Sequence, residues 1–540
     1  MNNREIVFVV VEEYDNLGAG YLSAILKPKG FNCHYINVRA RVTASLKAIR
    51  EIDPFIIGFS VIFHHYLSYY IRLAEYLRKK NIICHFTAGG HYASLQPVEL
   101  FDRMPQLDSI VRFEGEKTMT ELAQRLSGSL GWTSLKGLSY RDLNGKVIHN
   151  PHRAFVKDID VFPFPVRPSI KEFPFGKRFT TIIAGRGCVH NCSFCNTRKF
   201  YSQSAYSIKR VRSPEKVVNE MAELYRNHLC GIFFFLDDDF PVKWRGNNMW
   251  ILKFCSELTK QGLKGKVTWK ISCRPDEVEE SVFSLMKEHG LFSVFLGIED
   301  GTPEGLIRMN KKLQPQDSLN AIAVLKKLKI RFDYGFMLFH PYTTFDSLRK
   351  NIDYIERICA DGYTPASFLR MIPFYCTKLA EDLCVEERLK TSQKGLSYKF
   401  PEKSMDRYYS FVMKCFYAWL RTSDGLYNNT RIIIDQTEVF RFYWNDDPIL
   451  QPLISKINKI AEESNAFILS VLRRLIPVFE GKTERKENAV LLAQIYKRVK
   501  EYHYYFNYWI SAYSEELCTR GQKLLIEEYT GLIRTMAGSE

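Results

Sequence analysis

The feature that most restricts what this chain can fold into is a group of three cysteines in one short loop. Cys188, Cys192 and Cys195 have the spacing Cys-x3-Cys-x2-Cys within the run Ala184-Gly-Arg-Gly-Cys-Val-His-Asn-Cys-Ser-Phe-Cys-Asn196. A β-branched run at 179–183 predicts a strand before the loop, and the glycines between them predict a turn. Three thiolates can hold three irons of a cubane cluster and leave the fourth iron open. Structural zinc or iron–sulfur sites are normally closed by four ligands. Buried or zinc-binding cysteines are the alternative.

Length and composition indicate a globular protein of several domains. The chain has 540 residues, 46% of them hydrophobic, which suggests three or four domains. No window approaches 18 consecutive apolar residues, and the N-terminus lacks the pattern of a signal peptide. We therefore expect a cytoplasmic protein whose thiols stay reduced, with the other ten of its 13 cysteines packed or inert. The net charge of +16 is compatible with an acidic partner or with a basic solvated surface.

Residues 1–130 alternate between strand and helix patterns. Strands are predicted at 6–11, 32–38, 55–60, 82–88 and 109–112, and helices at 17–27 (opened by a glycine-rich turn), 42–51 and 67–80. This alternation predicts a parallel, doubly wound, Rossmann-like sheet that binds ligands beyond the carboxyl ends of its strands. The glycine pair Gly89 and Gly90 follows the fourth strand and would let a ligand approach the backbone closely.

The rest of the chain divides into three further segments. Residues 131–178 predict a hairpin with Asn144-Gly145 at its turn and then a proline-rich linker. Residues 179–385 predict six strands, at 179–183, 231–236, 267–272, 293–298, 331–339 and 367–372, with polar clusters at their carboxyl ends, as in a (β/α) barrel. Residues 386–540 predict a helical domain. Its aromatic run 502–509 is interpreted as helix core, with a substrate wall as the alternative.

The cysteine loop, with Phe194 before its last cysteine, closely resembles the signature of the radical S-adenosylmethionine (SAM) superfamily. The strand pattern of 179–385 resembles the partial (β/α)6 barrel of that superfamily. The resemblance implies a [4Fe-4S] cluster on Cys188, Cys192 and Cys195, with Phe194 at the cofactor. The amino and carboxylate groups of SAM would chelate the open iron, and one electron from the cluster would cleave SAM to a 5′-deoxyadenosyl radical.

The same resemblance implies roles for residues at the strand ends. Asp238 or Asp239 would contact the SAM amino group, and Arg274 would pair with its carboxylate, unless Arg274 is only a rim ion pair. Glu299 stands in Gly-Ile-Glu-Asp-Gly, where the family has Gly-Ile-Glu-Ser-Gly, and would touch the cofactor pocket. At 339–344 the chain departs from the family's Gly-Phe-Pro-Gly-Glu-Thr, and His340 and Tyr342 there are acid/base groups or space-fillers. Cys376 stands where the family commonly has glycine, and we expect it to be packed.

Three motifs of the N-terminal segment look like the cobalamin-binding domain of cobalamin-dependent radical SAM enzymes. They are Asn-Leu-Gly-x-Gly-Tyr-Leu after the first strand, Gly-Gly-x-Tyr after the fourth and Glu-Gly-Glu-x-Thr after the fifth. The cobalamin-binding residues implied are Leu17, Gly18, Ser60, Gly89, Gly90, Glu114 and Gly115. The chain departs from the Asp-x-His-x-x-Gly motif of many cobalamin proteins, because loop 12–18 has no histidine to serve as the lower cobalt ligand. At least one of His64 and His65 is expected to be packed or solvated, and neither is assigned a role.

The sequence thus predicts an α/β enzyme with [4Fe-4S], SAM and cobalamin as cofactors. Its predicted parts are a cobalamin-binding Rossmann-like domain (1–130), a hairpin and linker (131–178), a radical SAM partial barrel (179–385) and a mostly α-helical C-terminal domain (386–540). The leading interpretation is methylation of an unactivated carbon of a small molecule or peptide, with a flavodoxin or ferredoxin as low-potential electron donor. The alternatives are a cyclase or rearrangement enzyme with the same cofactors, a radical SAM enzyme that has lost cobalamin, and a basic binding protein with a structural cluster.

Overall fold

The computed structural model describes residues 4–11, 15–202, 207–392, 395–481 and 485–537. It divides into two compact units, each discontinuous in sequence. Unit 1 comprises Met1–Ser169, Thr181–Lys216 and Ile372–Ser397, and unit 2 comprises Ile170–Thr180, Val217–Met371 and Tyr398–Glu540.

Unit 1 is built on a seven-stranded sheet. Its strand order is β2 (Asn32–Asn37), β1 (Glu5–Val10), β3 (Ile56–Ser60), β4 (His85–Gly89), β5 (Ser109–Val111), β6 (Leu138–Arg141) and β7 (Val147–His149). The first five strands are parallel, and the hairpin β6–β7 adds two antiparallel strands at one edge. The parallel sheet predicted for the N-terminal segment is therefore confirmed, and the hairpin with its turn at Asn144-Gly145 extends that sheet.

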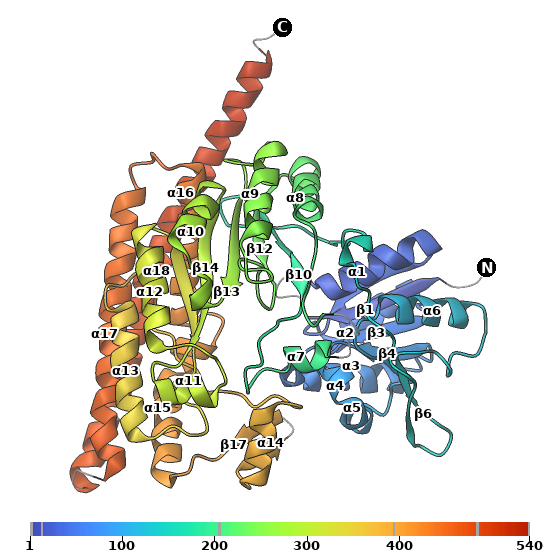
Figure 1. Cartoon of the computed structure of the whole chain (residues 1–540), viewed down its shortest axis with the longest axis horizontal. Helices are drawn as coiled ribbons and strands as arrows, with labels where there is room; N and C mark the ends of the chain where they lie inside the picture. Colours follow the sequence, from blue (N-terminus) through green and yellow to red (C-terminus); the bar gives the residue numbers. More distant parts are fainter. Residues whose placement is uncertain (1–3, 12–14, 203–206, 393–394, 482–484, 538–540) are drawn as a thin grey trace. The chain divides into compact units, whose positions relative to one another are not determined.

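Helices cover both faces of this sheet (Figure 1). They are α1 (Leu17–Leu26), α2 (Val42–Ile52), α3 (Leu67–Lys79), α4 (His91–Leu95), α5 (Pro97–Arg103) and α6 (Glu116–Ser127), with 3-10 turns η1 (Lys27–Lys29), η2 (His64–Tyr66) and η3 (Ile159–Val161). One apolar core contains Val7 and Phe59 with residues of α2 and α3, and another contains Phe8 with residues of α1 and α6. The inner strands β1 and β3 are buried on both faces, which explains why they are apolar nearly throughout, whereas the edge strand β2 is largely polar and partly exposed.

The expected glycine-rich turn before the first helix is instead part of the helix. Gly18 and Gly20 lie in α1, whose cap is Asn16: its Oδ1 accepts a hydrogen bond from the N–H of Ala19. A Cβ on Gly20 would lie 2.6 Å from the carbonyl oxygen of Val166. The glycine therefore lets the proline-rich linker lie directly against α1.

Unit 1 also contains the cysteine loop and a later segment of the chain. These parts form β10 (Gly185–Arg186), β11 (Arg210–Val211), α7 (Thr197–Tyr201), α14 (Lys378–Val385) and the two-stranded sheet of β16 (Leu389–Ser392) and β17 (Gly395–Tyr398). The strands β16 and β17 precede the helices of the segment 386–540, which was expected to be mostly α-helical. The C-terminal helices begin only at residue 403.

Unit 2 is built on the second large sheet. Its strand order is β15 (Arg331–Phe336), β14 (Leu291–Glu299), β13 (Thr268–Cys273), β12 (Cys230–Phe235), β9 (Arg178–Ile182) and β8 (Lys171–Glu172). Strands β12 to β15 are parallel, as predicted, and the short β8 pairs antiparallel with β9 in what was expected to be linker. The sixth expected strand, 367–372, is reduced to one bridge between Phe339 and Arg370. Pro365 and Pro373 flank it and have no N–H to donate to a longer ladder.

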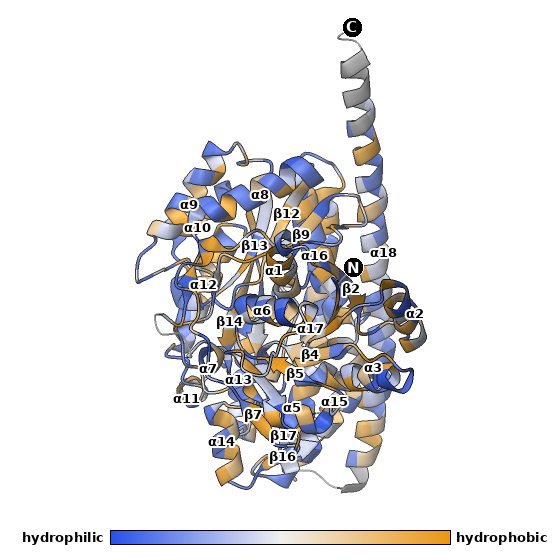
Figure 2. Ribbon diagram, turned by 90° about the vertical axis from the view of Figure 1, so that its right-hand side faces the viewer, coloured by the Kyte–Doolittle hydropathy of each residue, from blue (hydrophilic) through white to orange (hydrophobic). Residues whose placement is uncertain are grey.

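Helices cover both faces of the second sheet. Those that follow strands are α8 (Pro214–His228), α9 (Met249–Lys260), α10 (Glu280–Glu288), α11 (Pro303–Arg308), α12 (Pro315–Lys327) and α13 (Phe345–Cys359), with the 3-10 turn η4 (Pro275–Glu277). Trp269 of β13 packs edge-on against Phe254 of α9. Figure 2 shows the mixed polar and apolar colouring of α9 and α10, as expected for helices with one face on a core.

The C-terminal helices are α15 (Lys403–Arg421), α16 (Leu426–Tyr443), α17 (Leu450–Glu480) and α18 (Arg485–Ala537). Lys270 of β13 bonds to Asp435 of α16 at 2.7 Å, and Arg331 of β15 to Glu438 at 3.0 Å. Successive side chains of a strand point to opposite faces of the sheet. Trp269 faces α9 and the next residue, Lys270, faces α16, so the two helices lie on opposite faces of the second sheet. In the described part of the chain no helix is long and apolar enough to cross a membrane.

Candidate cofactor sites

The three cysteines lie close together in sequence on an open loop of unit 1, between β10 and α7. All three are partly exposed, and none forms a disulfide. The loop is tight, since the N–H of Cys195 donates to the carbonyl oxygen of Cys192 at 3.1 Å. Three accessible thiols with no fourth cysteine beside them in the loop are a donor set that fits a cluster with one open iron.

Glycines on both sides of Arg186 allow the backbone before the loop to approach β11. A Cβ on Gly185 would lie 2.8 Å from the carbonyl oxygen of Arg210, and one on Gly187 would lie 2.1 Å from that of Ile208. Gly187 also has a φ of +84°, which disfavours other residues. The expected turn is thus a short strand followed by a left-handed residue, and only glycine fits both positions.

The residues expected to bind cobalamin gather at one edge of the first sheet. Ser60, Gly89 and Glu114 stand at or just after the carboxyl ends of β3, β4 and β5, and Leu17 opens α1. Asn16 ties two of these loops together, because its Nδ2 donates to the hydroxyl of Ser60 at 3.2 Å. This edge is where parallel α/β sheets bind their ligands.

Gly90 allows the backbone after β4 to pass unusually close to the backbone after β3. Its φ is +106°, and a Cβ there would lie 2.8 Å from the carbonyl oxygen of Val61. The hydroxyl of Ser94 donates to the carbonyl oxygen of Gly90 at 2.7 Å and fixes this turn. The side-chain-free backbone at Gly89 and Gly90 fits a large planar cofactor that must come close to the strand ends.

Replacing Gly90 by alanine is expected to distort this edge. The φ strain and the clash with Val61 should destabilise unit 1 by about 1–3 kcal/mol and lower the amount of cobalamin bound. Gly145→Ala is the matched control, because Gly145 also has positive φ (+79°) but nothing lies within 4 Å of its Cβ position. Denaturant unfolding and the cobalamin absorbance of the purified protein measure both effects. Equal losses in the two variants would contradict a special role for Gly90.

The Glu114 side chain is held by two arginines. Arg186 Nη1 donates to Oε1 at 3.0 Å, and Arg210 bonds to Oε1 at 2.5 Å and to Oε2 at 3.0 Å. Burial would raise the pKa of Glu114, but the hydrogen bonds and charges of Arg210 and Arg186 lower the pKa below its ordinary value. Glu114 is therefore ionised at neutral pH. Gly115 follows it as the N-cap of α6.

His64 is a packed histidine, as expected for at least one member of the pair. It is buried and lies among the rings of Tyr92, Phe374 and Tyr375, with centroids 6.1–6.3 Å away. Burial, together with His65 and Arg103, lowers the pKa of His64 to about 4, so its ring is neutral at pH 7. Gly395 is required beside it, because a Cβ there would lie 1.9 Å from the ring.

The residues expected to contact SAM follow neighbouring strands of the second sheet. Asp238 and Asp239 follow β12, Arg274 follows β13 and Glu299 ends β14. Because these strands are adjacent and parallel, their carboxyl ends lie at one edge of unit 2. Asp238 is exposed and Asp239 is buried.

Arg274 is buried and only partly satisfied by its neighbours. Its Nε and Nη2 donate to the carboxylate of Asp276 at 2.9 and 3.2 Å. Its Nη1 is buried with no hydrogen-bond partner among the described residues. A buried guanidinium N–H left unpaired is costly unless a ligand accepts from it, and a carboxylate such as that of SAM fits this need.

Glu299 is fixed in a strained position at the end of β14. Its φ is +71°, and its Oε1 accepts from Lys311 Nζ at 3.0 Å. The next residue, Asp300, is fully buried and accepts from the backbone and hydroxyl of Thr302, both at 2.7 Å. Lys311 and Asp300 were not predicted; the acidic pair in Gly-Ile-Glu-Asp-Gly carried a signal only for Glu299.

His340, Tyr342 and Cys376 make contacts with neighbouring protein groups. His340 is buried with a pKa lowered to about 4, by burial first and by Arg308 second, and its Nδ1 accepts from the N–H of Tyr342. Cys376 has a φ of +60°, which explains why glycine suits that position, and its Sγ lies 3.2 Å from Gln96 Nε2. Cys376 is only partly buried, so its packing stays a prediction.

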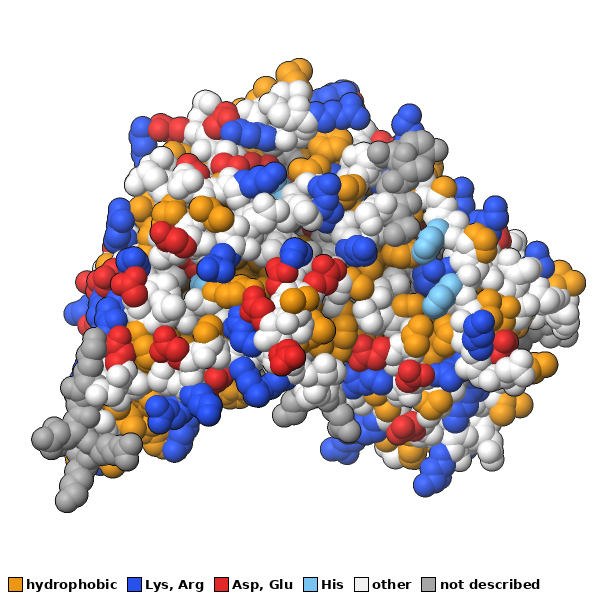
Figure 3. Space-filling model, turned by 60° about the horizontal axis from the view of Figure 1, so that its bottom comes forward, with side chains coloured by type: hydrophobic (Ala, Val, Ile, Leu, Met, Phe, Trp, Pro, Cys, Tyr) orange, Lys and Arg blue, Asp and Glu red, His pale blue; other side chains and the backbone are white. Residues whose placement is uncertain are grey.

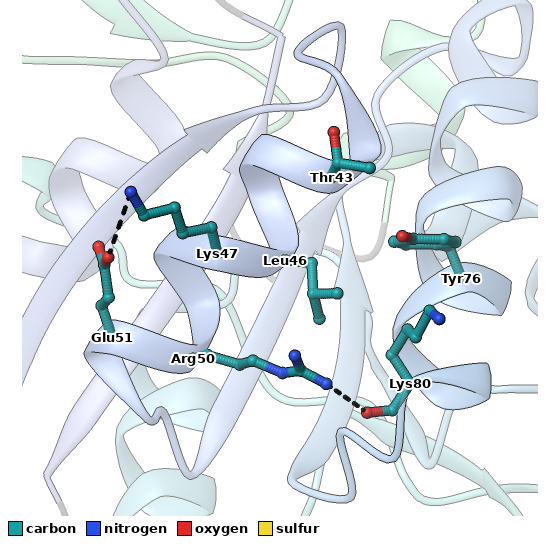
Figure 4. A pocket seen from close by; sticks show the side chains of 7 residues that line it. All are labelled: Thr43, Leu46, Lys47, Arg50, Glu51, Tyr76 and Lys80. Atoms are coloured by element: carbon teal, nitrogen blue, oxygen red, sulfur yellow. Dashed lines mark hydrogen bonds and ion pairs between the residues drawn. The ribbon is translucent and has the colours of Figure 1, made fainter.

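A surface hollow between α2 and α3 is not part of these sites. It is lined by Thr43, Leu46, Lys47, Arg50, Glu51, Tyr76 and Lys80 (Figure 4). Two of its polar groups are already engaged: Lys47 pairs with Glu51 at 3.9 Å, and Arg50 donates to the carbonyl oxygen of Lys80. Its lining runs along α2 and includes the C-terminal end of α3, and it contains none of the residues expected at the cofactor sites. On the face drawn in Figure 3, basic and acidic side chains are interspersed.

Comparison with known proteins agrees with this geometry. Residues 182–355 match the model of the radical SAM superfamily, and residues 4–123 match that of the B12 binding domain. The chain therefore contains a radical SAM domain. Because it also carries a B12 binding domain, it is a cobalamin-dependent radical SAM enzyme whose cofactors are a [4Fe-4S] cluster, SAM and cobalamin.

The chain is similar to several known proteins and to solved structures of cobalamin-dependent SAM radical enzymes. The uncharacterized methyltransferase PH0819 of Pyrococcus horikoshii is 27% identical over 374 residues, which are 68% of this chain and 77% of that protein. The anaerobic magnesium-protoporphyrin IX monomethyl ester cyclase of Rubrivivax gelatinosus is 30% identical over 48% of this chain, but the match spans only 47% of the cyclase. The structure of OxsB, a cobalamin-dependent SAM radical enzyme, has the same fold, with a TM-score of 0.67 at 18% identity over 98% of this chain and 81% of OxsB.

Proposed function

We propose that this enzyme methylates a carbon atom of its substrate. The observation that carries the proposal is that a B12 binding domain and a radical SAM segment occur in one chain, together with similarity over two thirds of the chain to a protein named a methyltransferase. When bound, the cluster with SAM supplies a carbon radical that abstracts hydrogen, and cobalamin supplies a transferable methyl group. The sequence-based assignment of the individual site residues is part of this proposal.

Three side chains would hold the iron–sulfur cluster, and others would orient SAM. Cys188, Cys192 and Cys195 would each ligate one iron. Support comes from their partial exposure and their place on one tight loop. Phe194, partly exposed on the same loop, would border the cofactor.

The strand ends of unit 2 would recognise the amino-acid part of SAM. Arg274 would donate from Nη1 to its carboxylate, while Asp276 keeps the guanidinium in place. Asp238 or Asp239 would accept from its amino group. Glu299, held by Lys311, would contribute a fixed negative charge to the same edge of the sheet.

Unit 1 would hold cobalamin over the carboxyl edge of its sheet. The backbone of Gly89 and Gly90, with Leu17, Gly18, Ser60 and Gly115, would form the contact surface. Loop 12–18 contains no histidine, so no lower cobalt ligand is expected from it. Glu114 was expected to touch the cofactor, but its carboxylate is engaged by arginines, so any contact would come from its backbone.

A cyclisation with the same cofactors is the second candidate, favoured by the similarity to the Rubrivivax cyclase. Product mass distinguishes the two. The anaerobically reconstituted enzyme, supplied with SAM, cobalamin, a reductant and candidate substrates, should yield a product heavier by one CH2 group. A product lighter by two hydrogens would establish the cyclase instead. SAM consumption without 5′-deoxyadenosine would refute every radical mechanism.

The enzyme needs a substrate and a reductant, and we propose a flavodoxin or ferredoxin for the latter. The substrate would be a small molecule or peptide, with acidic groups if the basic net charge serves binding. A cytoplasmic location would suit thiols that must stay reduced to bind iron.

A further inference from the structure

The two ends of the cysteine loop are attached to the B12 binding domain inside unit 1. Arg186, two residues before Cys188, lies in β10 directly opposite Arg210 of β11. Two like charges facing each other across a strand pair destabilise it unless a counter-charge intervenes. The counter-charges are Glu114 and Glu116, which follow β5 of the B12 binding domain.

These four side chains form a buried quartet. Arg186 Nη1 lies 3.0 Å from Glu114 and 2.7 Å from Glu116, and Arg210 lies 2.5 Å from Glu114. Exposed fractions of the four side chains are only 4–11%. The Arg186 guanidinium also lies over the rings of Tyr21 and Phe162, at about 5 Å from each centroid. Buried ion pairs of this kind tolerate substitution poorly, because the loss of one partner leaves an uncompensated buried charge.

The other end of the loop is attached by apolar contacts. Phe200 of α7, five residues after Cys195, is buried and stacks on the ring of His91 from α4 with centroids 3.9 Å apart. It also lies 5.4 Å from the ring of Phe113, which immediately precedes Glu114. Phe113 itself has a strained φ of +62° and donates its N–H to the hydroxyl of Ser94.

We propose that Arg186 and Glu114 are positioning residues that fix the iron–sulfur cluster relative to cobalamin. We call the quartet and the Phe200 contacts together the clamp. Its acidic partners follow the strand β5, whose carboxyl end belongs to the edge proposed to hold cobalamin, and its basic partners flank the proposed cluster ligands. One rigid connection thus joins the two cofactor sites, and neither acidic side chain needs to touch a cofactor. A displacement of about 1 Å between reacting groups can cost 10²-fold in rate, so such a connection matters for coupling the two cofactors.

The test is the magnetic interaction between the reduced cluster and cob(II)alamin, measured by electron paramagnetic resonance on the full chain loaded with both cofactors. Arg186→Met should keep bound iron and cobalamin but lose the wild-type interaction and broaden the distance distribution. Arg186→Lys, which retains one charge but not the fork, should recover it in part. Glu114→Gln should show an intermediate loss. This readout needs no methyl transfer, so it stays valid if the enzyme proves to be a cyclase.

Arg78→Met is the matched control. Arg78 pairs with Asp108 at 2.8 Å in the same unit, and its other hydrogen bonds go to the carbonyl oxygens of Ile82, Cys84 and Gln106, all outside the cysteine loop and α7. It should lower stability and leave the magnetic interaction unchanged. A wild-type interaction in loaded Arg186→Met would overturn the proposal. If Arg186→Met fails to fold, a wild-type interaction in both Arg186→Lys and Glu114→Gln would overturn it equally.

Discussion

Cys192→Ala abolishes both the iron–sulfur absorbance and the cleavage of SAM in anaerobically reconstituted protein. This result is expected because two remaining thiolates cannot hold three irons of the cubane, and no other cysteine lies within the loop. Iron content, the visible spectrum and 5′-deoxyadenosine formation measure the effect. Binding of cobalamin should persist, since its expected contacts lie on other loops of unit 1.

Cys384→Ala is the matched control for this prediction. Cys384 is the exposed thiol of α14, in the same unit but outside the loop. Its removal should leave iron content and SAM cleavage at wild-type levels. Retention of the cluster in Cys192→Ala would show that the ligand assignment is wrong.

Arg274→Lys weakens SAM binding about 10- to 100-fold while the cluster remains. The expected loss corresponds to about 1.5–3 kcal/mol for a hydrogen bond between charged groups. Lysine keeps the charge and can still pair with Asp276, but it lacks the second arm of the guanidinium that carries Nη1. Titration of the cluster-loaded protein with SAM gives the dissociation constants directly.

Two further variants make this measurement specific. Arg226→Lys, on the exposed side of α8, should bind SAM like the wild type. Asp276→Asn should weaken SAM binding less than Arg274→Lys, because it loosens the guanidinium without removing a donor. Unchanged affinity in Arg274→Lys would mean that Arg274 is only a rim ion pair with Asp276.

Periodicity and spacing predicted the elements that local sequence determines. The parallel strands of both sheets, the hairpin at Asn144-Gly145 and most of the C-terminal helices are confirmed. The strand expected at 367–372 is reduced to a single bridge, and a two-stranded sheet that was not predicted precedes the expected C-terminal helices. In both places a few residues are held by long-range contacts that no local pattern reveals, such as the packing of His64 against Gly395.

The candidate site was predictable where a family motif coincides with a strand end. Cys188, Glu299 and Gly90 occur in such motifs, and Arg274 was chosen because it follows a predicted strand. The partners that hold these residues were not predictable. Lys311 reaches Glu299 from a later loop, and the pairing of Arg186 with Glu114 joins residues 72 positions apart. A single sequence does not indicate which distant opposite charges meet.

The position of α16 has a consequence for recombining this enzyme with its relatives. Helix α16 is bound to the second sheet through Lys270–Asp435 and Arg331–Glu438, the latter pair only about 5% exposed. A chimera that exchanges the C-terminal region alone would leave the partly buried Lys270 and the buried Arg331 without their acidic partners. Crossovers after α13 should therefore yield insoluble protein unless the donor sequence supplies acids at both positions. The natural unit of exchange is the sheet and α16 together, which ties any change in the C-terminal region to matching changes in β13 and β15.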